Sequence, residues 1–286
     1  MRVSYVIVTY HSTDQVGALV ESIAIQSSEG GSEIIVVDNS PDDSCKAIVE
    51  SACPSAKFIQ NDSNRGYTAA INQAITLAGG EFLFLLTPDV VLQEKCTENL
   101  IAAFNGSAGA TAPQLLNSDG SIQKSVRNFP RFSTLIYDSI GLAKLFPANN
   151  TLGRWRNLYF PHDQLREVEQ PMASALMIHR AAMEKVGDWD EQFFVFFSDV
   201  DYCKRIYDAG YSILFVPQAK AKHEVGGSTR HEGTWLIWDS HRGFARYLQK
   251  HELRGFKLIL WPLAKLLLWV GAVGRVLMRK LKGQGF

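Results

Sequence analysis

The sequence lacks the signatures of several common protein classes. Its 286 residues contain only four cysteines, and none of them has C-x-x-C spacing, which argues against a zinc ribbon or a disulfide framework and favours reduced thiols. No G-x-G-x-x-G follows the first predicted strand, and P-loop, H-E-x-x-H and G-x-S-x-G motifs are absent. Rossmann oxidoreductases, P-loop NTPases, zincin proteases and serine hydrolases therefore lose their main support.

The sequence also lacks a long apolar run, and it has no acidic residue in its C-terminal segment. No uninterrupted apolar run reaches the roughly 20 residues that a membrane span needs. The run from Val3 to Val8 is too short for a signal sequence, so we expect the body of the protein in the cytoplasm. No acidic residue follows Glu252, which leaves a charge of −7 on residues 1–253 and +7 on the remainder. An acidic body is a poor general binder of nucleic acid, and we expect no such partner.

Apolar runs of strand length alternate with segments of helical period along the first hundred residues. Strands are predicted at residues 3–9, 33–37, 57–60 and 81–86, and helices at 13–26, 46–52, 67–78 and 94–104. This alternation predicts an α/β fold with a mostly parallel central sheet and helices on both faces. Residues 106–170 show weaker periodicity, and we expect connecting structure and a mobile loop there. A second ordered block follows, with strands predicted at 175–178 and 213–216 and helices at 180–186 and 199–209.

Polar residues stand at the carboxyl ends of the first four predicted strands, where open sheets bind their ligands. They are Thr9, Tyr10 and His11, then Asp38 and Asn39, then Asn61 and Asp62, then Thr87 and Asp89. Ordinary loop chemistry would also place polar groups at strand ends. Four ends that converge on one edge of the sheet favour a binding site.

Three segments near these ends carry chemistry that suits a nucleotide. Asp38 directly ends a strand, where its carboxylate can accept hydrogen bonds from a base or from ribose hydroxyls, although residues 40–42 would equally make a turn and a helix cap. Residues 64–66 form an Asn-Arg-Gly turn before a helix rich in small residues, so Arg65 can contact a phosphate or a base. Asp89 offers one oxygen ligand suited to Mg²⁺ or Mn²⁺.

A later segment, from Gly187 to Asp201, combines aromatic residues with carboxylates. Such a composition suits sugars, because rings pack on apolar sugar faces while acids such as Asp190 bind hydroxyls. Ser198 with Asp201 also matches the S-x-x-D capping box, so Asp199 and Asp201 can simply complement a helix dipole. Of the two, we expect Asp201 to be structural and Asp199 to be open to the cleft.

Three basic side chains are further candidates. His223 precedes a Gly-Gly turn and can ligate a metal or a phosphate, although a lone histidine usually does neither. Arg127 and Arg131 can bind an anionic acceptor, and the alternative is that both are ordinary solvated arginines.

Taken together and in this order, the five segments resemble the inverting glycosyltransferases of family 2, which have the GT-A fold. Within that family, the sequence is most similar to bacterial rhamnosyltransferases of cell-surface polysaccharide assembly. The resemblance covers most of the first 230 residues and rests on residues 6–10, 36–40, 64–66, 88–89, 197–201 and 223–228. It implies a GT-A domain over residues 1–250, with a nucleotide-binding half at 1–105 and an acceptor-binding half at 106–250, before a basic amphipathic tail at 251–286.

The resemblance also implies a reaction and its residues. A sugar, for example rhamnose, would pass from a nucleoside diphosphate donor to a hydroxyl of a lipid-linked or polysaccharide acceptor, with inversion. Asp199 would be the base, and Asp89 with His223 would hold Mg²⁺ or Mn²⁺. The expected nucleotide-sugar site comprises Thr9, Tyr10, Asp38, Asn39, Arg65 and Asp89, and the expected acceptor site comprises Trp189, Asp190, Arg127 and Arg131.

Two departures from the family pattern support a rival. Thr87 occupies the place of the first carboxylate of the D-x-D motif, and Ser198 occupies a place where such enzymes often carry Glu. A catalytically silent sugar-nucleotide or glycan binding protein with this fold is therefore the alternative, whereas Asp89, Asp199 and His223 favour an enzyme. A sugar-phosphate nucleotidylyltransferase would need a glycine-rich N-terminal loop that this sequence lacks.

The basic tail predicts an amphipathic helix. At about 100° per residue, its cationic side chains share one narrow face, and Leu, Trp, Val and Met cover most of the rest. These cations are Arg254, Lys257, Lys265, Arg275, Arg279 and Lys282. Trp261 and Trp269 favour a helix lying in the plane of an anionic membrane, which would place the protein peripherally on the cytoplasmic face of the inner membrane. A helix packed on the body with a basic outer face is the alternative.

Overall fold

A central sheet organises the molecule. The structure is a computed structural model, and it describes residues 2–26, 31–41, 44–224 and 233–281. The strands of this sheet are β1 (Val3–Thr9), β2 (Glu33–Asp38), β3 (Lys57–Gln60), β4 (Phe82–Leu86), β5 (Val90–Leu92), β6 (Ala108–Leu116), β8 (Arg166–Glu167), β10 (Ala175–His179) and β11 (Ser212–His223). Their order is β3-β2-β1-β4-β10-β6-β11-β5, with β8 paired to β11.

The first half of the sheet matches the predicted alternation closely. β1 pairs in parallel with β2 and β4, and β2 pairs in parallel with β3. The connecting helices are α1 (Thr13–Gln26), α2 (Ser44–Ala52), α3 (Tyr67–Leu77) and α4 (Cys96–Ala102). Helix α1 buries Val16, Leu19, Val20 and Ile23, the face that its sequence period predicts. Two buried apolar clusters, one for each face of the sheet, hold these layers together.

The second half of the sheet is mixed. β10 is antiparallel to β4 and β6, whereas β11 is parallel to β6 and antiparallel to β5. Parallel pairing is therefore confined largely to the N-terminal half. The expectation of connecting structure and a mobile loop over residues 106–170 missed a core strand, because β6 lies in the interior of the sheet and residues 108–115 are buried. Its sequence, AGATAPQLL, has little intrinsic strand preference, so burial between two neighbours decides its conformation.

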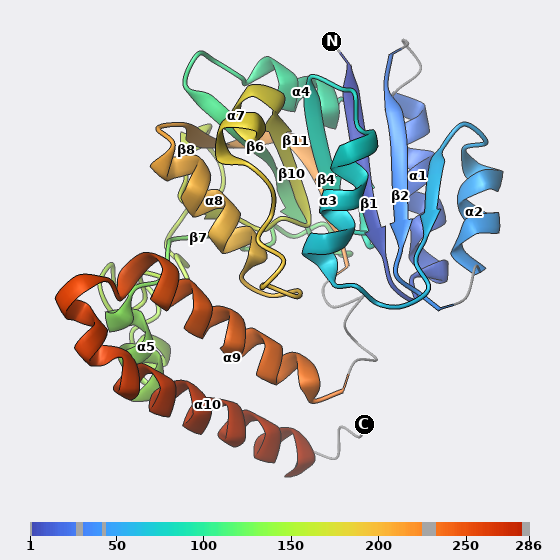
Figure 1. The fold of residues 1–286 in the computed structure, drawn as a ribbon. Helices are drawn as coiled ribbons and strands as arrows, with labels where there is room; N and C mark the ends of the chain where they lie inside the picture. The colour runs from blue at the N-terminus through green and yellow to red at the C-terminus, as the bar shows by residue number, and fades with distance from the viewer. Residues whose placement is uncertain (1, 27–30, 42–43, 225–232, 282–286) are drawn as a thin grey trace.

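A short ribbon and several helices lie outside the central sheet. A two-stranded ribbon pairs β7 (Val126–Arg127) with β9 (Gln170–Pro171). The remaining helices of the body are α5 (Phe132–Ser139), α6 (Leu142–Leu145), α7 (Arg180–Val186) and α8 (Ser198–Asp208). Figure 1 shows α3 and α8 on one face of the sheet, with α1 and α2 on the other.

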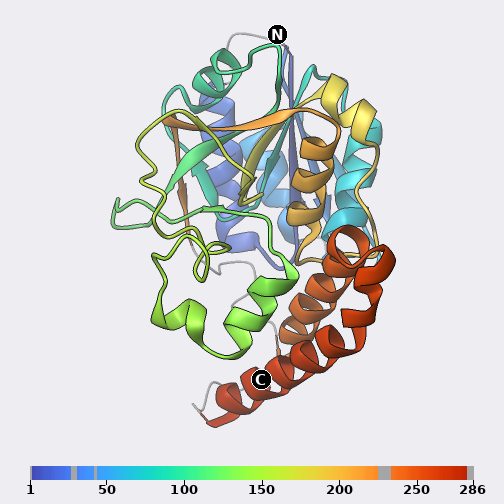
Figure 2. The same cartoon turned by 90° about the vertical axis from the view of Figure 1, so that its left-hand side faces the viewer.

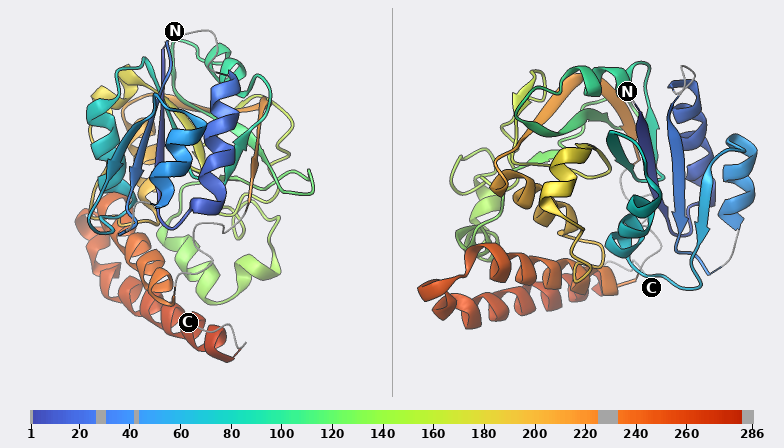
Figure 3. Two further views of the ribbon diagram at one scale, coloured as in Figure 1. Left: turned by 90° about the vertical axis from the view of Figure 1, so that its right-hand side faces the viewer. Right: turned by 45° about the horizontal axis from the view of Figure 1, so that its top comes forward.

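The C-terminal region forms a helical hairpin below the body (Figures 1 and 2). It comprises α9 (Trp235–Tyr247), a π-helix (Leu248–Glu252), a 3-10 helix (Gly255–Leu260) and α10 (Trp261–Leu281). The two long helices run side by side, as both views of Figure 3 show, and α5 also packs on α10. Helix α10 thus begins later than the single helix predicted from Arg254, and Pro262 lies in its first turn, where a missing N–H costs least.

Helix α10 buries small and apolar residues and exposes a different apolar face. Ala264, Leu268 and Ala272 are buried on the side facing the body. Arg279 Nη1 donates a hydrogen bond to the backbone oxygen of Gly233, 3.1 Å away, so this arginine also points inward. The other described cations of the predicted face, Arg254, Lys257, Lys265 and Arg275, are exposed, as both the in-plane membrane helix and the packed helix with a basic outer face require. The region also exposes large apolar side chains: Phe256, Leu258, Ile259, Leu263, Leu266, Trp269, Val270, Leu277, Met278 and Leu281.

By length and composition alone, residues Gly255–Leu281 pass as a candidate membrane span. Their mean hydropathy is 1.7, and 17% of the apolar window is buried in the structure. Lys282, the last cation of the predicted basic face, lies outside the described residues.

Candidate active site

The carboxyl ends of β1 and β2 bring the first predicted site residues together, since Thr9 and Asp38 are register partners. Asp38 is fully buried. Its Oδ1 accepts hydrogen bonds from the backbone N–H (2.9 Å) and the hydroxyl (2.6 Å) of Ser40. Its Oδ2 is buried and has no hydrogen-bond partner in the part of the chain that the structure describes. Because an unpaired buried oxygen is costly, this atom is suited to accept a hydrogen bond from a ligand hydroxyl or base.

The other predicted nucleotide residues lie at different depths. Thr9 and Asn39 are buried, whereas Tyr10 is half-buried and Arg65 is exposed. Asn39 Nδ2 donates to the backbone oxygen of Gly66 at 3.1 Å, so its amide ties the end of β2 to the turn before α3. Side chains of Tyr10 and Arg65 are therefore the ones in this set that reach solvent.

Gly66 sets the shape of that turn. It has a φ of +85°, and a Cβ placed there would lie 2.8 Å from the ring of Phe194. Tyr67, the next residue, donates its backbone N–H to the oxygen of Phe194 at 2.7 Å. The turn that carries Arg65 is thus fixed against the aromatic segment before α8.

A second corner of the site contains Asp89 and His223, which antiparallel pairing of β5 with β11 brings together. His223 Nε2 lies 3.6 Å from Asp89 Oδ1. Its Nδ1 is 2.7 Å from Gln123 Oε1, an oxygen that can only accept, so Nδ1 carries the proton and the Nε2 lone pair faces Asp89. Burial lowers the pKa of His223, which favours the neutral imidazole that ligates metals.

The donor types at this corner fit a divalent cation. One carboxylate oxygen and one imidazole nitrogen, 3.6 Å apart, can both reach a single ion. Thr87 Oγ1 donates to Asp89 Oδ1 at 2.6 Å, so it orients the carboxylate. Among the described residues, no group of three or more His, Cys, Asp or Glu gathers around a possible ion position, and a diphosphate would have to supply further oxygens. Residues 225–228 of the fifth segment lie outside the described residues.

Asp199 lies in the first turn of α8 and is half-buried. Its Oδ1 accepts from its neighbour's backbone N–H (Val200, 2.9 Å), and its Oδ2 accepts from Gln170 Nε2 (2.9 Å). Burial raises the pKa of Asp199, although backbone hydrogen bonds from Val200 and Ala173 and the charge of Arg127 oppose the shift. A carboxylate with a raised pKa and a partly open face is a good proton acceptor for a bound hydroxyl.

Tyr67 connects the two corners of the site. Its pKa is raised by burial first, and then by the negative charges of Asp199 and Asp89, so both carboxylates lie close to it. The backbone gives a second link, because Thr87 N donates to Ser174 O at 3.0 Å. Asp89 and Asp199 therefore share one region at the edge of the sheet.

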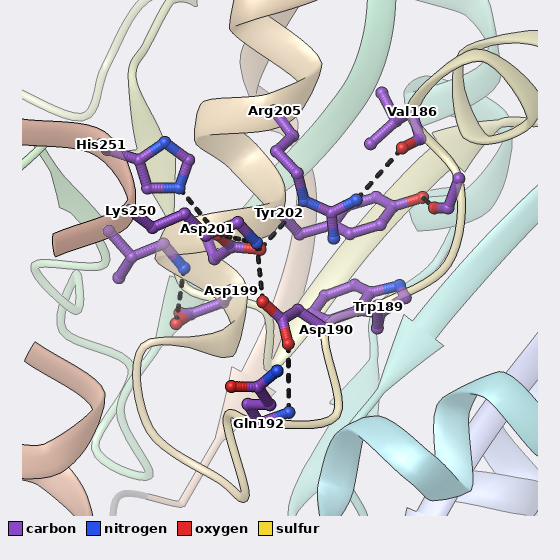
Figure 4. Close-up of polar contacts among 12 residues, drawn as sticks. Val186, Trp189, Asp190, Gln192, Asp199, Asp201, Tyr202, Arg205, Lys250 and His251 are labelled. Atoms are coloured by element: carbon purple, nitrogen blue, oxygen red, sulfur yellow. Dashed lines mark hydrogen bonds and ion pairs between the residues drawn. The ribbon is translucent and has the colours of Figure 1, made fainter. Parts of the chain in front are cut away.

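Asp201 occupies a structural position, as its sequence context predicts, but not as part of a capping box. The residue before α8 is Phe197, which has a left-handed φ of 67°, and Ser198 Oγ donates back to Val195 O at 2.7 Å. The predicted S-x-x-D cap is therefore wrong. Asp201 is buried and instead bonds to three cationic or ring nitrogens, from Arg205, Lys250 and His251 (Figure 4).

The predicted acceptor residues are more dispersed. Trp189 is only 2% exposed and stacks on Tyr202, with ring centroids 4.2 Å apart, so it does not present an open ring to a sugar. Asp190 is paired with Arg246 (2.8 Å) and Lys250 (2.8 Å), and these hydrogen bonds lower its pKa to about 2 against the effect of burial. The expected sugar-facing wall is therefore part of the core at Trp189, because sequence alone does not separate a core tryptophan from a sugar-stacking one.

The two predicted acceptor arginines stay on the surface. Arg127 and Arg131 are both exposed, and the guanidinium of Arg127 lies 5.7 Å from the ring centroid of Trp155. Arg127 also contributes its charge to the surroundings of Asp199. Among the described residues, the interactions therefore connect Arg127, but not Arg131, to Asp199.

The sequence matches the model of a known protein family. Residues 4–159 match the family model described as Glycosyl transferase family 2. The chain belongs to this family. This match confirms the predicted resemblance to the family 2 glycosyltransferases.

Two curated relatives cover most of the chain. N-acetylglucosaminyl-diphospho-decaprenol L-rhamnosyltransferase of Mycobacterium tuberculosis is 25% identical over 278 residues, covering 87% of this chain and 88% of the relative. The low-salt glycan biosynthesis hexosyltransferase Agl10 of Haloferax volcanii is 23% identical over 256 residues, covering 87% of this chain and 76% of the relative.

Solved structures show the same GT-A fold. The mannosyltransferase PcManGT from Pyrobaculum calidifontis, in complex with GDP-Man and Mn²⁺, superposes with a TM-score of 0.61 at 15% identity, covering 94% of this chain and 73% of that one. GalNAc-T7 with UDP, GalNAc and Mn²⁺ gives a TM-score of 0.60 at 14% identity, covering 87% of this chain and 48% of that one. This family 2 glycosyltransferase thus spans about half the length of GalNAc-T7 in that structure.

Several residues around the site have no distinguishing signal in the sequence. Gln170 and Gln123 each bind a predicted site residue, but both come from the stretch that lacked periodicity. Lys250 and His251 join Asp201 across 49 and 50 residues of chain. Tyr67 could have been singled out, because it directly follows the Asn-Arg-Gly turn.

Proposed function

We propose that this family 2 glycosyltransferase transfers a sugar, rhamnose or a hexose, from a nucleoside diphosphate donor to a hydroxyl of a lipid-linked or polysaccharide acceptor in cell-surface glycan biosynthesis. The observation that carries the proposal is Asp199, a half-buried carboxylate with a raised pKa near Asp89. The names of the two curated relatives, a rhamnosyltransferase with a polyprenyl diphosphate acceptor and a hexosyltransferase of glycan biosynthesis, support this substrate class.

The donor nucleotide would lie at the carboxyl ends of β1 and β2. Asp38 Oδ2 supports this placement, because it is a buried acceptor without a partner in the described part of the chain. Tyr10 and Arg65 reach solvent around it and would contact the base and the phosphates. Thr9 and Asn39 would hold the strand ends in place from within.

The diphosphate would lie beside Asp89 and His223. These two residues would hold Mg²⁺ or Mn²⁺, which when bound offsets the negative charge that develops on the leaving diphosphate. Mn²⁺ in the structures of PcManGT and GalNAc-T7 supports a divalent ion here. Thr87 in place of a second carboxylate would leave the empty protein with weak metal affinity.

Asp199 would act as the base in a single displacement. Its carboxylate takes the proton of the acceptor hydroxyl as the new bond forms between that oxygen and the anomeric carbon. The bond from the anomeric carbon to the diphosphate oxygen breaks at the same time, and the electron pair leaves with the diphosphate. Attack from the face opposite the leaving group inverts the configuration at the anomeric carbon.

A lipid-linked acceptor would bring the enzyme to the cytoplasmic face of the inner membrane. Helix α10 exposes an apolar face that includes Leu266 and Leu277, and it would lie in the headgroup region with Lys257 and Lys265 close to anionic lipids. Arg127 would approach an anionic group of the acceptor near Asp199.

The decisive experiment replaces the base. Asp199→Asn should retain donor binding, measured by thermal shift with a panel of nucleotide sugars, while transfer falls by at least about 100-fold. Near-normal transfer by this variant would overturn the assignment. A wild-type protein that binds a nucleotide sugar but neither transfers nor hydrolyses it, with or without Mg²⁺, would instead support the silent binding protein that Thr87 and Ser198 suggest.

A further inference from the structure

Gln170 makes an unusual set of contacts at the candidate base. It is buried, and its Nε2 donates to Asp199 Oδ2 at 2.9 Å and to the backbone oxygen of Pro171 at 3.1 Å. Both partners are acceptors only, so the amide orientation is fixed: a flipped amide would place Oε1 against two other oxygens. Gln170 therefore holds one particular oxygen of the carboxylate.

The other end of this amide is not satisfied. Gln170 Oε1 is buried and has no hydrogen-bond partner in the part of the chain that the structure describes. A site that needed only a filled volume would be served better by an apolar side chain of the same length, because an unpaired buried carbonyl oxygen destabilises the fold. The arrangement is explained if the N–H of the Gln170 amide is required to bind Asp199.

The β7–β9 ribbon places Gln170 accurately. Arg127 and Gln170 are register partners in this antiparallel pair, so their side chains project from the same face of the ribbon. Gln170 donates a hydrogen bond to Asp199, and Arg127 acts on Asp199 through its positive charge. The ribbon therefore presents two groups that favour the ionised carboxylate.

We propose that Gln170 is a positioning residue that fixes the orientation of the Asp199 carboxylate and keeps it ionised for proton transfer. This inference rests on the proposed function, in which Asp199 is the base. Gln170 holds Oδ2, Val200 holds Oδ1, and the backbone of Ala173 adds a further hydrogen bond, so these contacts favour one orientation of the carboxylate, in which its remaining lone pairs would accept the proton of the acceptor hydroxyl.

The test measures Asp199 directly. In protein labelled with ¹³C at aspartate carboxyl groups, the Asp199 signal is assigned by its loss in Asp199→Asn and then titrated in the wild type, in Gln170→Met and in Gln170→Glu. Met keeps the length of the side chain without its donor, so the pKa of Asp199 should rise by about one pH unit. Glu places a second carboxyl beside Oδ2, so the rise should be larger.

Transfer kinetics supply the second readout. Gln170→Met should lower kcat by about 10- to 100-fold and move the acid limb of the pH profile upward together with the NMR titration. Gln114→Leu is the matched control: it removes another buried glutamine, one that donates to the backbone oxygen of His162, and should leave the Asp199 titration unchanged. Should Gln170→Met not fold, Gln170→Glu and the wild type still give the comparison.

The outcomes separate the two proposals. An Asp199 titration that is the same in the wild type and in both Gln170 variants would overturn the role of Gln170. Loss of stability in Gln170→Met with an unchanged titration and pH profile would also overturn it, because a purely structural residue gives that result. Wild-type levels of transfer by Asp199→Asn would overturn the assignment of Asp199 as the base, and absence of transfer by the wild-type protein would overturn the proposed function itself, whatever the Gln170 variants do.

Discussion

Lys250 Nζ lies 2.8 Å from Oδ1 of Asp201, and this contact joins the C-terminal hairpin to the helix that carries the candidate base. The same ammonium lies 2.8 Å from Oδ2 of Asp190, in the segment before that helix (Figure 4). His251 adds a 2.7 Å contact to Asp201 from the same π-helix. The hairpin is therefore fastened to the body at a point two residues from Asp199.

Replacing Lys250 tests this connection. Lys250→Met should lower the free energy of unfolding by about 1–2 kcal/mol, because Asp190 and Asp201 each lose one charged partner but keep others. Thermal or urea unfolding measures the change. Lys257→Met is the matched control, since Lys257 is exposed on the 3-10 helix, and its unfolding should match the wild type. Equal stability of the two variants would show that Lys250 does not fasten the hairpin.

Asn substitutions at Asp199 and Asp201 should change stability in opposite directions. Burial raises the pKa of Asp199, so at neutral pH its charge is less stable in the folded state than in the unfolded state, and Asp199→Asn should raise the Tm. The hydrogen bonds of His251 and Lys250 lower the pKa of Asp201 against burial, so its charge stabilises the folded state. Asp201→Asn should therefore cost about 3 kcal/mol while transfer per folded molecule changes little. Calorimetric melting of both variants at pH 7 provides the comparison.

Acid should weaken the Asp190 contacts in a defined range. The pKa of Asp190 is lowered to about 2 by Lys250 and Arg246, so its stabilising effect is complete above the unfolded value of about 4 and is lost as the pH falls toward 2. Asp190→Asn should therefore lower stability at neutral pH and reduce its fall between these two pH values. Urea unfolding at a series of pH values measures this slope, and parallel curves for variant and wild type would contradict the prediction.

Metal binding at the proposed site should depend on the diphosphate. With Asp89 and His223 as the two proposed protein ligands, Mn²⁺ should bind the empty protein weakly and bind more tightly when a nucleoside diphosphate is present. Thr87→Asp adds a second carboxylate next to Asp89 and should tighten Mn²⁺ binding to the empty protein. Calorimetric titration measures both effects. Tight binding by the wild type without nucleotide, or full activity in excess chelator, would contradict this arrangement.

Much of the N-terminal half of the sheet could be predicted from the sequence, because its elements follow local rules. Strand-length runs ended in polar residues, and helix α1 showed an apolar face with helical spacing, so the boundaries of β1, α1 and β3 agree with those expected. The convergence of Asp38 and Asp89 at one sheet edge followed from parallel topology. These features depend on contacts near in sequence.

The features that the sequence did not predict depend on distant contacts. Strand β6 is rich in alanine and becomes a strand only because β10 and β11 enclose it. Gln170 contacts Asp199, which lies 29 residues later in the sequence, and a single glutamine forms no recognisable motif. Trp189 has the composition of a sugar-binding surface, yet packing against Tyr202 places it in the core. Only the tertiary structure distinguishes these cases.

Helix α10 should bind anionic membranes through its exposed apolar face without crossing them. Leu266 and Leu277 are 56% and 54% exposed, and Lys257 and Lys265 are exposed in the same C-terminal region. Each basic residue near an anionic surface contributes roughly 1 kcal/mol, screened by salt, whereas the apolar contribution persists in salt. Co-sedimentation with anionic vesicles should therefore fall partly, not wholly, at high salt.

Two paired variants separate these contributions. Leu266→Ser with Leu277→Ser should remove the salt-resistant part of vesicle binding, and Lys257→Gln with Lys265→Gln should remove much of the salt-sensitive part. Leu77→Ser is the control, because Leu77 is 41% exposed on α3, away from the hairpin, and binding should not change. Alkaline carbonate should release the wild-type protein, since an in-plane helix is held only at the surface. Retention in the pellet would show instead that Gly255–Leu281 spans the bilayer, as its length and composition allow.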